Sequence, residues 1–182
     1  MSAAGLAKTK ILSAAAAVVG RSGAAHLTID AVAAEAKLSK GGVLYHFPSK
    51  RAILEGMLDR LISRYSERIS RFEAELGDEP DAAIRAVILA DRGQDAEERS
   101  MALALLAAAA EDPELLAPAR AVIGQWFEAV EQSSGNVQLG ILLLLATEGL
   151  RFLDMLDLLP AGGTRREQLG QTLLNVAEAG RL

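Results

Sequence analysis

Apolar residues recur at the three- and four-residue spacing of an α-helix along nearly the whole chain. The first such stripe joins Ile11, Leu12, Ala15 and Val19 on one face of a helix between residues 8 and 20. Comparable stripes follow, and no segment favours a strand. The pattern therefore predicts an all-α fold of about nine helices.

Short segments with Gly, Pro or capping residues set the expected helix limits. Gly20 and Gly23 end the first helix, Thr28 and Ser39 cap two short helices, and Thr164 caps the last one. The expected helices after the first cover residues 28–36, 40–46, 49–76, 81–90, 97–110, 112–132, 137–159 and 164–179. The helix over 137–159 is apolar nearly all round and so must be covered on more than one side.

The composition agrees with helices and narrows the class of protein. Aromatic residues make up 4% of the 182 residues, and there is no cysteine, so no disulfide framework or cysteine metal site is expected. The two histidines, His26 and His46, lack metal-ligand spacing. The N-terminus is too polar for a signal peptide, and the longest apolar run, residues 139–146, falls short of the roughly 18 residues of a membrane span. We expect a cytoplasmic protein with no cofactor and no membrane partner.

Charge is distributed unevenly along the chain. The first 64 residues hold nine basic and four acidic side chains, a charge of +5. Because the net charge of the chain is −5, the remaining residues carry −10. A basic head on an acidic body indicates that the head meets an anion, although a chance distribution on a solvated surface is the alternative.

The two short helices, 28–36 and 40–46, have the lengths and tight connection of a helix-turn-helix. Their apolar face would come from Ile29, Val32, Ala33, Leu38 and Val43, with the first helix packed across it. In this motif the second helix enters the major groove of DNA, with its N-terminal residues facing base edges.

The stretch from Leu27 to Leu54, LTIDAVAAEAKLSKGGVLYHFPSKRAIL, resembles the tetracycline-repressor (TetR) family of bacterial transcriptional regulators. The resemblance covers residues 11–61 and rests on a set of matched positions: Thr28, Val32, Ala36, Ser39-Lys40-Gly41, Tyr45-His46 and Phe47-Pro48-Ser49-Lys50. It implies a DNA-binding head, residues 1–48, and a body for regulation and dimerisation, residues 49–182. The helix over 49–76 links the two.

Two positions depart from the family pattern. Lys37 stands in the turn where family members usually carry Gly, and a positive φ there would cost a non-glycine residue about 1 kcal/mol. Leu44 occupies the position where many members have Tyr. The sequence leaves open whether Leu44 or Tyr45 makes the main contact in the groove.

The predicted DNA contacts combine hydroxyls, glycines, aromatic rings and lysines. Hydroxyls and lysines can reach phosphates or base edges, and glycines allow the backbone to lie close to the groove. Plain capping and packing are the structural alternatives for several of them. The predicted residues are Thr28, Ser39, Lys40, Gly41, Gly42, Leu44, Tyr45, His46 and Lys50.

The resemblance also implies a homodimer and a small-molecule effector for the body. We predict a four-helix bundle from the last two helices of each subunit, with contacts from Leu139, Leu142, Leu169, Leu173 and Val176. The candidate wall of a mostly apolar effector cavity is Met101, Leu105, Trp126, Phe127, Glu148, Arg151, Phe152 and Met155. Core packing, or a solvated charge, is the alternative explanation for each of these eight.

The sequence has no phosphate loop, metal-ligand cluster or nucleophile-base pattern, so we do not expect an enzyme. The resulting hypothesis is a regulator that binds a palindromic operator on double-stranded DNA at the bacterial nucleoid. It would be a repressor released by a small hydrophobic effector, with activation left open. The alternative is a helical interaction module whose head binds anions without sequence preference.

Overall fold

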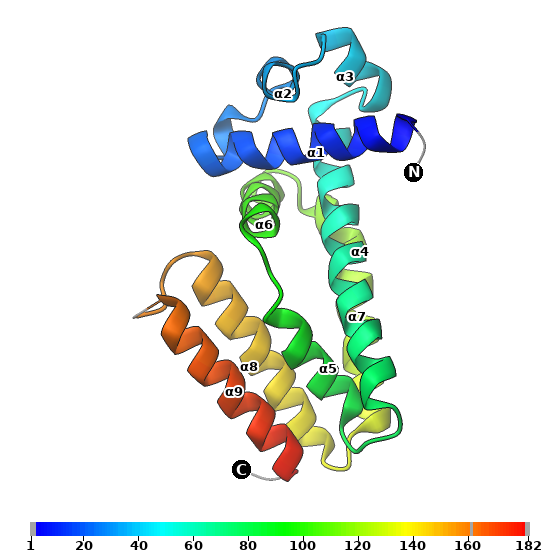
Figure 1. Ribbon diagram of the computed structural model, residues 1–182, viewed down its shortest axis with the longest axis vertical. Helices are drawn as coiled ribbons and strands as arrows, with labels where there is room; N and C mark the ends of the chain where they lie inside the picture. The colour runs from blue at the N-terminus through cyan, green and yellow to red at the C-terminus, as the bar shows by residue number, and fades with distance from the viewer. Residues whose placement is uncertain (1–2, 161, 181–182) are drawn as a thin grey trace. The chain divides into compact units, whose positions relative to one another are not determined.

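The computed structural model describes residues 3–160 and 162–180 of the chain, and these residues form nine α-helices, two short 3-10 helices and no strand (Figure 1). Within this part of the chain no helix has the length and apolar character needed to cross a bilayer. The elements are α1 (Ala3–Ser22), η1 (Ala24–His26), α2 (Ile29–Ala36), α3 (Lys40–His46), α4 (Lys50–Leu76), α5 (Ala82–Asp91), α6 (Ala96–Ala109), η2 (Pro113–Leu116), α7 (Ala117–Ser133), α8 (Val137–Met155) and α9 (Gly162–Ala179).

The helices group into two compact units. Unit 1 comprises Met1–Leu61 and Asp95–Ala119, and unit 2 comprises Ile62–Gln94 and Arg120–Leu182. Unit 1 thus adds α6 and the start of α4 to the three N-terminal helices. The end of the DNA-binding head at residue 48 stays a prediction.

Unit 1 is built on the apolar face of α1, which packs against α2, α3 and α6. The predicted stripe of Ile11, Leu12, Ala15 and Val19 is buried. The helix continues beyond the expected stop at Gly20 and ends at Ser22, before Gly23 with a φ of 83°. Gly20 lies inside the helix, and its missing side chain permits the close approach of Ser100 of α6, whose Oγ lies 2.8 Å from where a Cβ would stand.

The turn between α2 and α3 is a Schellman motif centred on Lys37. Its φ of 51° places it in the left-handed region, as the sequence predicts. The Lys37 N–H donates to the Ala34 carbonyl at 3.2 Å and the Leu38 N–H donates to the Ala33 carbonyl at 3.0 Å. These two bonds satisfy the last carbonyls of α2 and direct the chain into α3.

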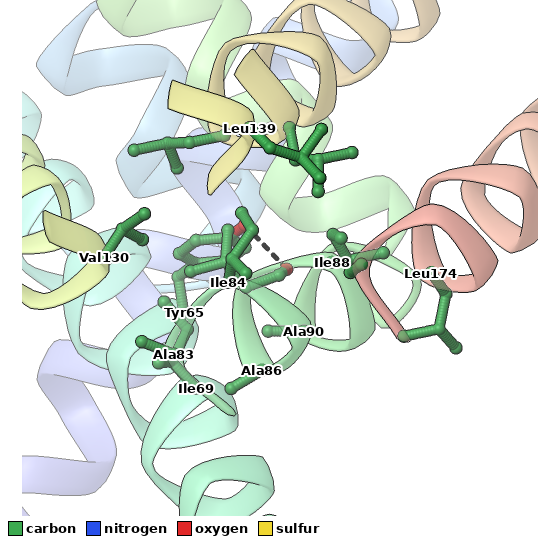
Figure 2. Close-up of a cluster of buried hydrophobic side chains, with 14 residues drawn as sticks. Tyr65, Ile69, Ala83, Ile84, Ala86, Ile88, Ala90, Val130, Leu139 and Leu174 are labelled. Atoms are coloured by element: carbon green, nitrogen blue, oxygen red, sulfur yellow. Dashed lines mark hydrogen bonds between the residues drawn. The ribbon is translucent and has the colours of Figure 1, made fainter. Parts of the chain in front are cut away.

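Unit 2 has its own apolar core, centred on α5, with α8 and α9 packed beside it (Figure 2). Seven of the ten residues of α5 are buried. The second half of α4 adds Tyr65 and Ile69, α7 adds Val130, and α9 adds Leu174. Because aromatic residues are scarce, small and branched side chains fill most of this core.

Three expected helix limits are wrong in detail. The helix expected over 112–132 opens as η2, because Pro113 follows Asp112 and the Leu115 N–H donates to the Asp112 carbonyl. The helix expected to reach residue 159 ends at Met155, where left-handed Asp157 forms a second Schellman turn. Thr164 lies inside α9 and does not cap it.

Replacing Lys37 with glycine should stabilise the protein, because glycine adopts a positive φ without a side-chain penalty. We expect Lys37→Gly to raise the free energy of unfolding by about 1 kcal/mol in urea titration. Lys37→Ala is the matched control, since it removes the same charge and keeps the Cβ. An equal gain in both variants would show that charge, and not backbone conformation, limits this turn.

Candidate nucleic-acid interface and buried charge cluster

The inner face of α3 is fixed by Val43, which is fully buried, and the following Phe47 is buried as well. The outer face carries Leu44 and Tyr45. Tyr45 exposes 84% of its surface and Leu44 exposes 36%, so Tyr45 projects much further from the protein. Tyr45 is therefore more available for contact than Leu44, which stands at the usual tyrosine position of the family.

Hydroxyl caps hold the start of each helix around this face. Thr28 Oγ1 accepts the Ala31 N–H at 3.1 Å, and Ser39 Oγ accepts the Gly42 N–H at 3.0 Å. Both side chains are therefore N-caps, which was the structural alternative to a role in DNA contact. Each cap leaves the hydroxyl hydrogen for a further acceptor, so capping is compatible with a phosphate contact.

The two glycines of α3 differ in their surroundings. A Cβ at Gly41 would have only Ser39 Oγ near it, at 4.0 Å, so this side of the helix is open. A Cβ at Gly42 would lie 3.3 Å from the same oxygen and would crowd the cap. Gly41 leaves space for an approaching ligand, whereas Gly42 protects the start of the helix.

The predicted cations are not equally free. Lys40 Nζ lies 3.0 Å from Asp30 Oδ2, and both side chains are exposed. Lys50 is exposed at the start of α4 and has no ion-pair partner among the described residues. His46 is half-buried, and its ring packs edge-on against Tyr45 with the centroids 5.0 Å apart. The sequence did not reveal the Lys40–Asp30 pair, because ten residues and a turn separate the partners.

The eight candidate effector contacts are divided between the two units. Met101 and Leu105 belong to unit 1, where both are buried in the core. In unit 2, Trp126 packs against Tyr65 at a centroid separation of 5.0 Å, and Phe127 packs on the same apolar cluster. Phe152 is exposed and Met155 is half-buried.

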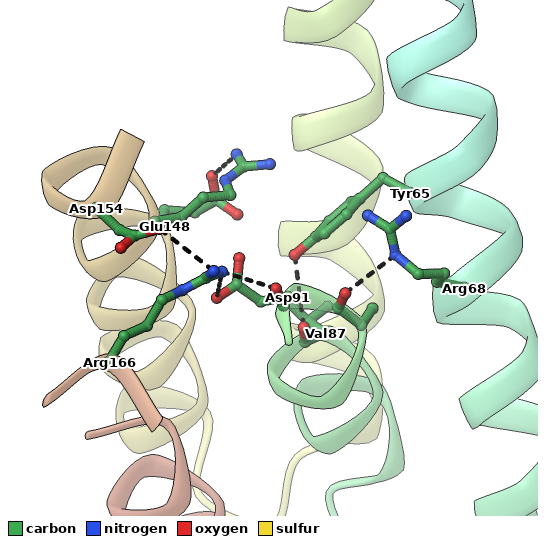
Figure 3. A network of polar contacts seen from close by, with 9 residues as sticks. Tyr65, Arg68, Val87, Asp91, Glu148, Asp154 and Arg166 are labelled. Atoms are coloured by element: carbon green, nitrogen blue, oxygen red, sulfur yellow. Dashed lines mark hydrogen bonds and ion pairs between the residues drawn. The ribbon is translucent and has the colours of Figure 1, made fainter. Parts of the chain in front are cut away.

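Glu148 and Arg151, the two charged candidates, belong to a polar cluster between α4, α5, α8 and α9 (Figure 3). They form an ion pair, and the Arg151 guanidinium lies 5.1 Å from the centroid of the Tyr65 ring. Burial raises the pKa of Tyr65, so its hydroxyl stays protonated. That hydroxyl donates to the Val87 carbonyl at 3.5 Å.

Arg166 of α9 holds the other end of the cluster. Its guanidinium donates to the carbonyl of Asp91 at 2.8 Å and to Asp91 Oδ2 at 3.0 Å, and lies 3.3 Å from Asp154. Burial raises the pKa of Asp91, against the opposing effect of Arg166, and burial likewise raises the pKa of Glu148 against Arg151. Sequence patterns do not indicate that Asp91 and Arg166 are partners, because 75 residues separate them.

A cleft of about 460 Å³ opens beside this cluster, between α5, α8 and α9. None of the eight predicted effector contacts is among its lining residues. Its described lining is Ile88, Asp91, Arg92, Thr147, Leu150, Arg166, Glu167, Gly170, Gln171 and Leu173.

The predicted dimer contacts divide by burial. Leu139 lies in the core of its own subunit, and Leu173 and Val176 are half-buried. Leu142 and Leu169 are exposed. Helix α8 adds further exposed apolar side chains on the Leu142 face, namely Leu145, Phe152 and Leu153.

Two family profiles match the chain. The profile described as "Bacterial regulatory proteins, tetR family" matches residues 11–57, and "Tetracyclin repressor-like, C-terminal domain" matches residues 81–178. The second match alone spans more than half of the chain. The chain belongs to the TetR family. The resemblance carried by residues 27–54 is thereby confirmed.

A curated relative and two solved structures extend the comparison. The HTH-type transcriptional regulator BetI of Stenotrophomonas maltophilia is 30% identical over 66 residues, which are 36% of this chain and about a third (34%) of BetI. A transcriptional regulator from Rhodococcus sp. Rha1 has a TM-score of 0.74 at 21% identity, covering 95% of this chain and 96% of its own. A protein from Saccharomonospora viridis, solved in complex with choline, has a TM-score of 0.73 at 20% identity and covers 96% of both chains. These two structures confirm the all-α fold.

The raised pKa of Glu148 predicts a pH-dependent contribution to stability. Its ionisation costs free energy only in the folded protein, so this cost is absent below the ordinary carboxyl pKa and complete above the raised one. We expect Glu148→Gln to become more stable relative to the wild type as pH rises from about 4 to about 7. Urea unfolding at both pH values measures this difference, and Glu128→Gln on the exposed side of α7 is the control.

Proposed function

We propose that this TetR-family protein is a sequence-specific DNA-binding transcriptional regulator that acts on chromosomal DNA in the bacterial cytoplasm. The observation that carries the proposal is the outward face of α3, where Tyr45 and Gly41 are exposed over the buried anchor Val43. Lys50 lies at the start of the next helix, free of ion pairs among the described residues. A face with a protruding ring, an open backbone and nearby cations suits a major groove and its flanking phosphates.

Selection from random duplexes at controlled salt tests the proposal. We expect enrichment of one palindromic sequence with half-sites about 34 Å apart or a multiple of that spacing. Binding without enrichment would favour the alternative, an interaction module whose head meets anions without sequence preference. Absence of DNA binding would contradict both.

Lys50→Ala should weaken binding to operator and bulk DNA alike, because a lysine beside a helix N-terminus contacts phosphate and not a base. The slope of log K against log salt concentration should fall by about 1 per subunit. Arg71→Ala is the matched control, since it removes an exposed cation from unit 2. Loss of sequence preference in Lys50→Ala would show that Lys50 reads a base.

We propose that α8 and α9 pair with the same helices of a second subunit. Leu142 exposes 51% of its surface and Leu145 exposes 54%, one helical turn apart. Gly149 lies on the same face, and a Cβ there would meet nothing within 4 Å. A self-complementary apolar face of this kind suits a two-fold dimer, which matches a palindromic site.

Leu142→Glu should convert the dimer to monomers, because each interface would then bury two unpaired carboxylates. Sedimentation equilibrium measures the change, and operator affinity should fall with it. Leu106→Glu introduces the same charge at an exposed leucine of α6 and should leave the dimer intact. A wild-type monomer at micromolar concentration would contradict the proposed pairing.

We propose that a small molecule bound in unit 2 regulates operator affinity, with repression relieved on binding. The protein has a cleft large enough for such a ligand, and similar folds have been solved with small organic molecules, choline among them. A ligand can shift the DNA-binding equilibrium only if it binds the two conformations with different affinity. We propose no catalytic role.

A further inference from the structure

The cleft between α5, α8 and α9 has an apolar wall and a charged end. Ile88, Leu150 and Leu173 form the wall, and Asp91 lines the charged end with Arg166 beside it. All of its described lining belongs to unit 2. The cleft therefore offers contact to an apolar group and to a charged one within the same ligand.

Asp91 is the buried group at the charged end. It is only 4% exposed, and its Oδ2 accepts from Arg166. Its Oδ1 is buried without a hydrogen-bond donor from any described residue. A buried carboxylate oxygen without a donor is unfavourable and rare, so this atom indicates a missing partner that can donate a hydrogen bond.

A second carboxylate of the cluster around Asp91 also lacks a donor among the described residues. The cluster contains three carboxylates, from Asp91, Glu148 and Asp154, and three guanidinium groups, from Arg68, Arg151 and Arg166 (Figure 3). Glu148 Oε1 is a second buried oxygen without a donor among the described side chains. Within the part of the chain that the structure describes, the cluster thus lacks donors for two of its carboxylate oxygens.

We propose that this cleft is a binding site for a small organic ammonium ion, with Asp91 as its anionic partner. The ammonium donates to the unpartnered oxygen of the Asp91 carboxylate, and charged donors make the strongest hydrogen bonds to carboxylates. The hydrocarbon part of the ligand lies against Ile88, Leu150 and Leu173. That this ion acts as the effector rests on the proposed function, whereas the binding itself does not.

Other ligands fit the cleft less well. An anion would need Arg92 or Arg166, but Arg92 already donates to Gln171 at 3.0 Å and Arg166 is shared between two carboxylates. A bare metal ion requires converging ligands, and no group of three or more acidic or histidine side chains suited to one occurs in the described part of the chain. The two unsatisfied atoms of this cluster, Asp91 Oδ1 and Glu148 Oε1, are acceptors, which favours a ligand with N–H donors.

Isothermal titration of the full-length protein with benzylammonium at pH 7 tests the proposal. Benzyl alcohol has a similar shape without the charge, and benzoate has the opposite charge. We expect benzylammonium to bind with one site per subunit and benzyl alcohol to bind at least tenfold more weakly, with no measurable binding of benzoate. Tighter binding of benzoate, or equal binding of the alcohol, would overturn the proposal.

Two variants locate the binding. Asp91→Asn keeps the side-chain shape and an acceptor for Arg166 but removes the charge, and should weaken benzylammonium binding at least tenfold. Gly170→Leu fills the cleft from α9 without altering Asp91, and should abolish binding. A Cβ at Gly170 would meet only Arg92 Nε, at 3.7 Å, so the first carbon of the new side chain has room.

Gly124→Leu is the matched control, because Gly124 lies on the exposed side of α7, where a Cβ would meet nothing within 4 Å. Circular dichroism establishes whether each variant is folded. If Asp91→Asn does not fold, the titration of Gly170→Leu alone decides whether the amine binds in the cleft. Unchanged binding in Gly170→Leu would overturn the proposed site. Calorimetric titration measures the binding of the amine directly. Failure of the protein to recognise an operator would therefore contradict the proposed function without changing the result for the amine site.

Discussion

The anchoring of α3 by Val43 is the constraint on which the candidate DNA interface depends. Helices of eight and seven residues, such as α2 and α3, are too short to be stable alone in water. Their stability comes from packing, and Val43 is the residue of α3 that reaches the core of unit 1. Once Val43 is fixed inward, the helical period places Tyr45 outward and leaves Gly41 on the open side.

The Schellman turn at Lys37 sets the direction in which α3 leaves α2. The two bonds that close it use only backbone groups, so any residue that accepts a left-handed φ can occupy the position. Glycine does so at least cost, which explains the family preference, but lysine is sterically possible at an exposed site. The departure from the family pattern therefore changes stability more than geometry.

Local signals made the first half of the fold predictable from sequence. The caps Thr28 and Ser39 and the positive φ of Lys37 depend on neighbours within five residues, and all three were predicted. The ends of the later helices were less accurate, because an Ala- and Leu-rich sequence continues the helical pattern through η2 and beyond Met155. The two-unit grouping, in which α6 joins the N-terminal helices, had no signal in sequence order. The polar contacts of unit 2 could not be predicted for a related reason, since Arg166 finds Asp91 across 75 residues and nothing near either position indicates the partner.

The buried charge cluster is the part of unit 2 where a ligand would gain the most interaction free energy on binding. The sequence favoured an apolar effector site from residue type alone, but apolar side chains such as Trp126 and Phe127 pack on the core cluster. A close-packed apolar core offers little to an added apolar group, because its side chains already fill the space in contact with one another.

Buried ions behave differently. They have lost their hydration by water, and part of the interaction that would compensate for this loss is absent. In this cluster the donors for two carboxylate oxygens are absent from the described part of the chain. A ligand that supplies them gains electrostatic interaction without opening the core, and any conformation that separates Asp91 from Arg166 would lose that gain. Differential affinity of this kind is what a regulatory ligand requires.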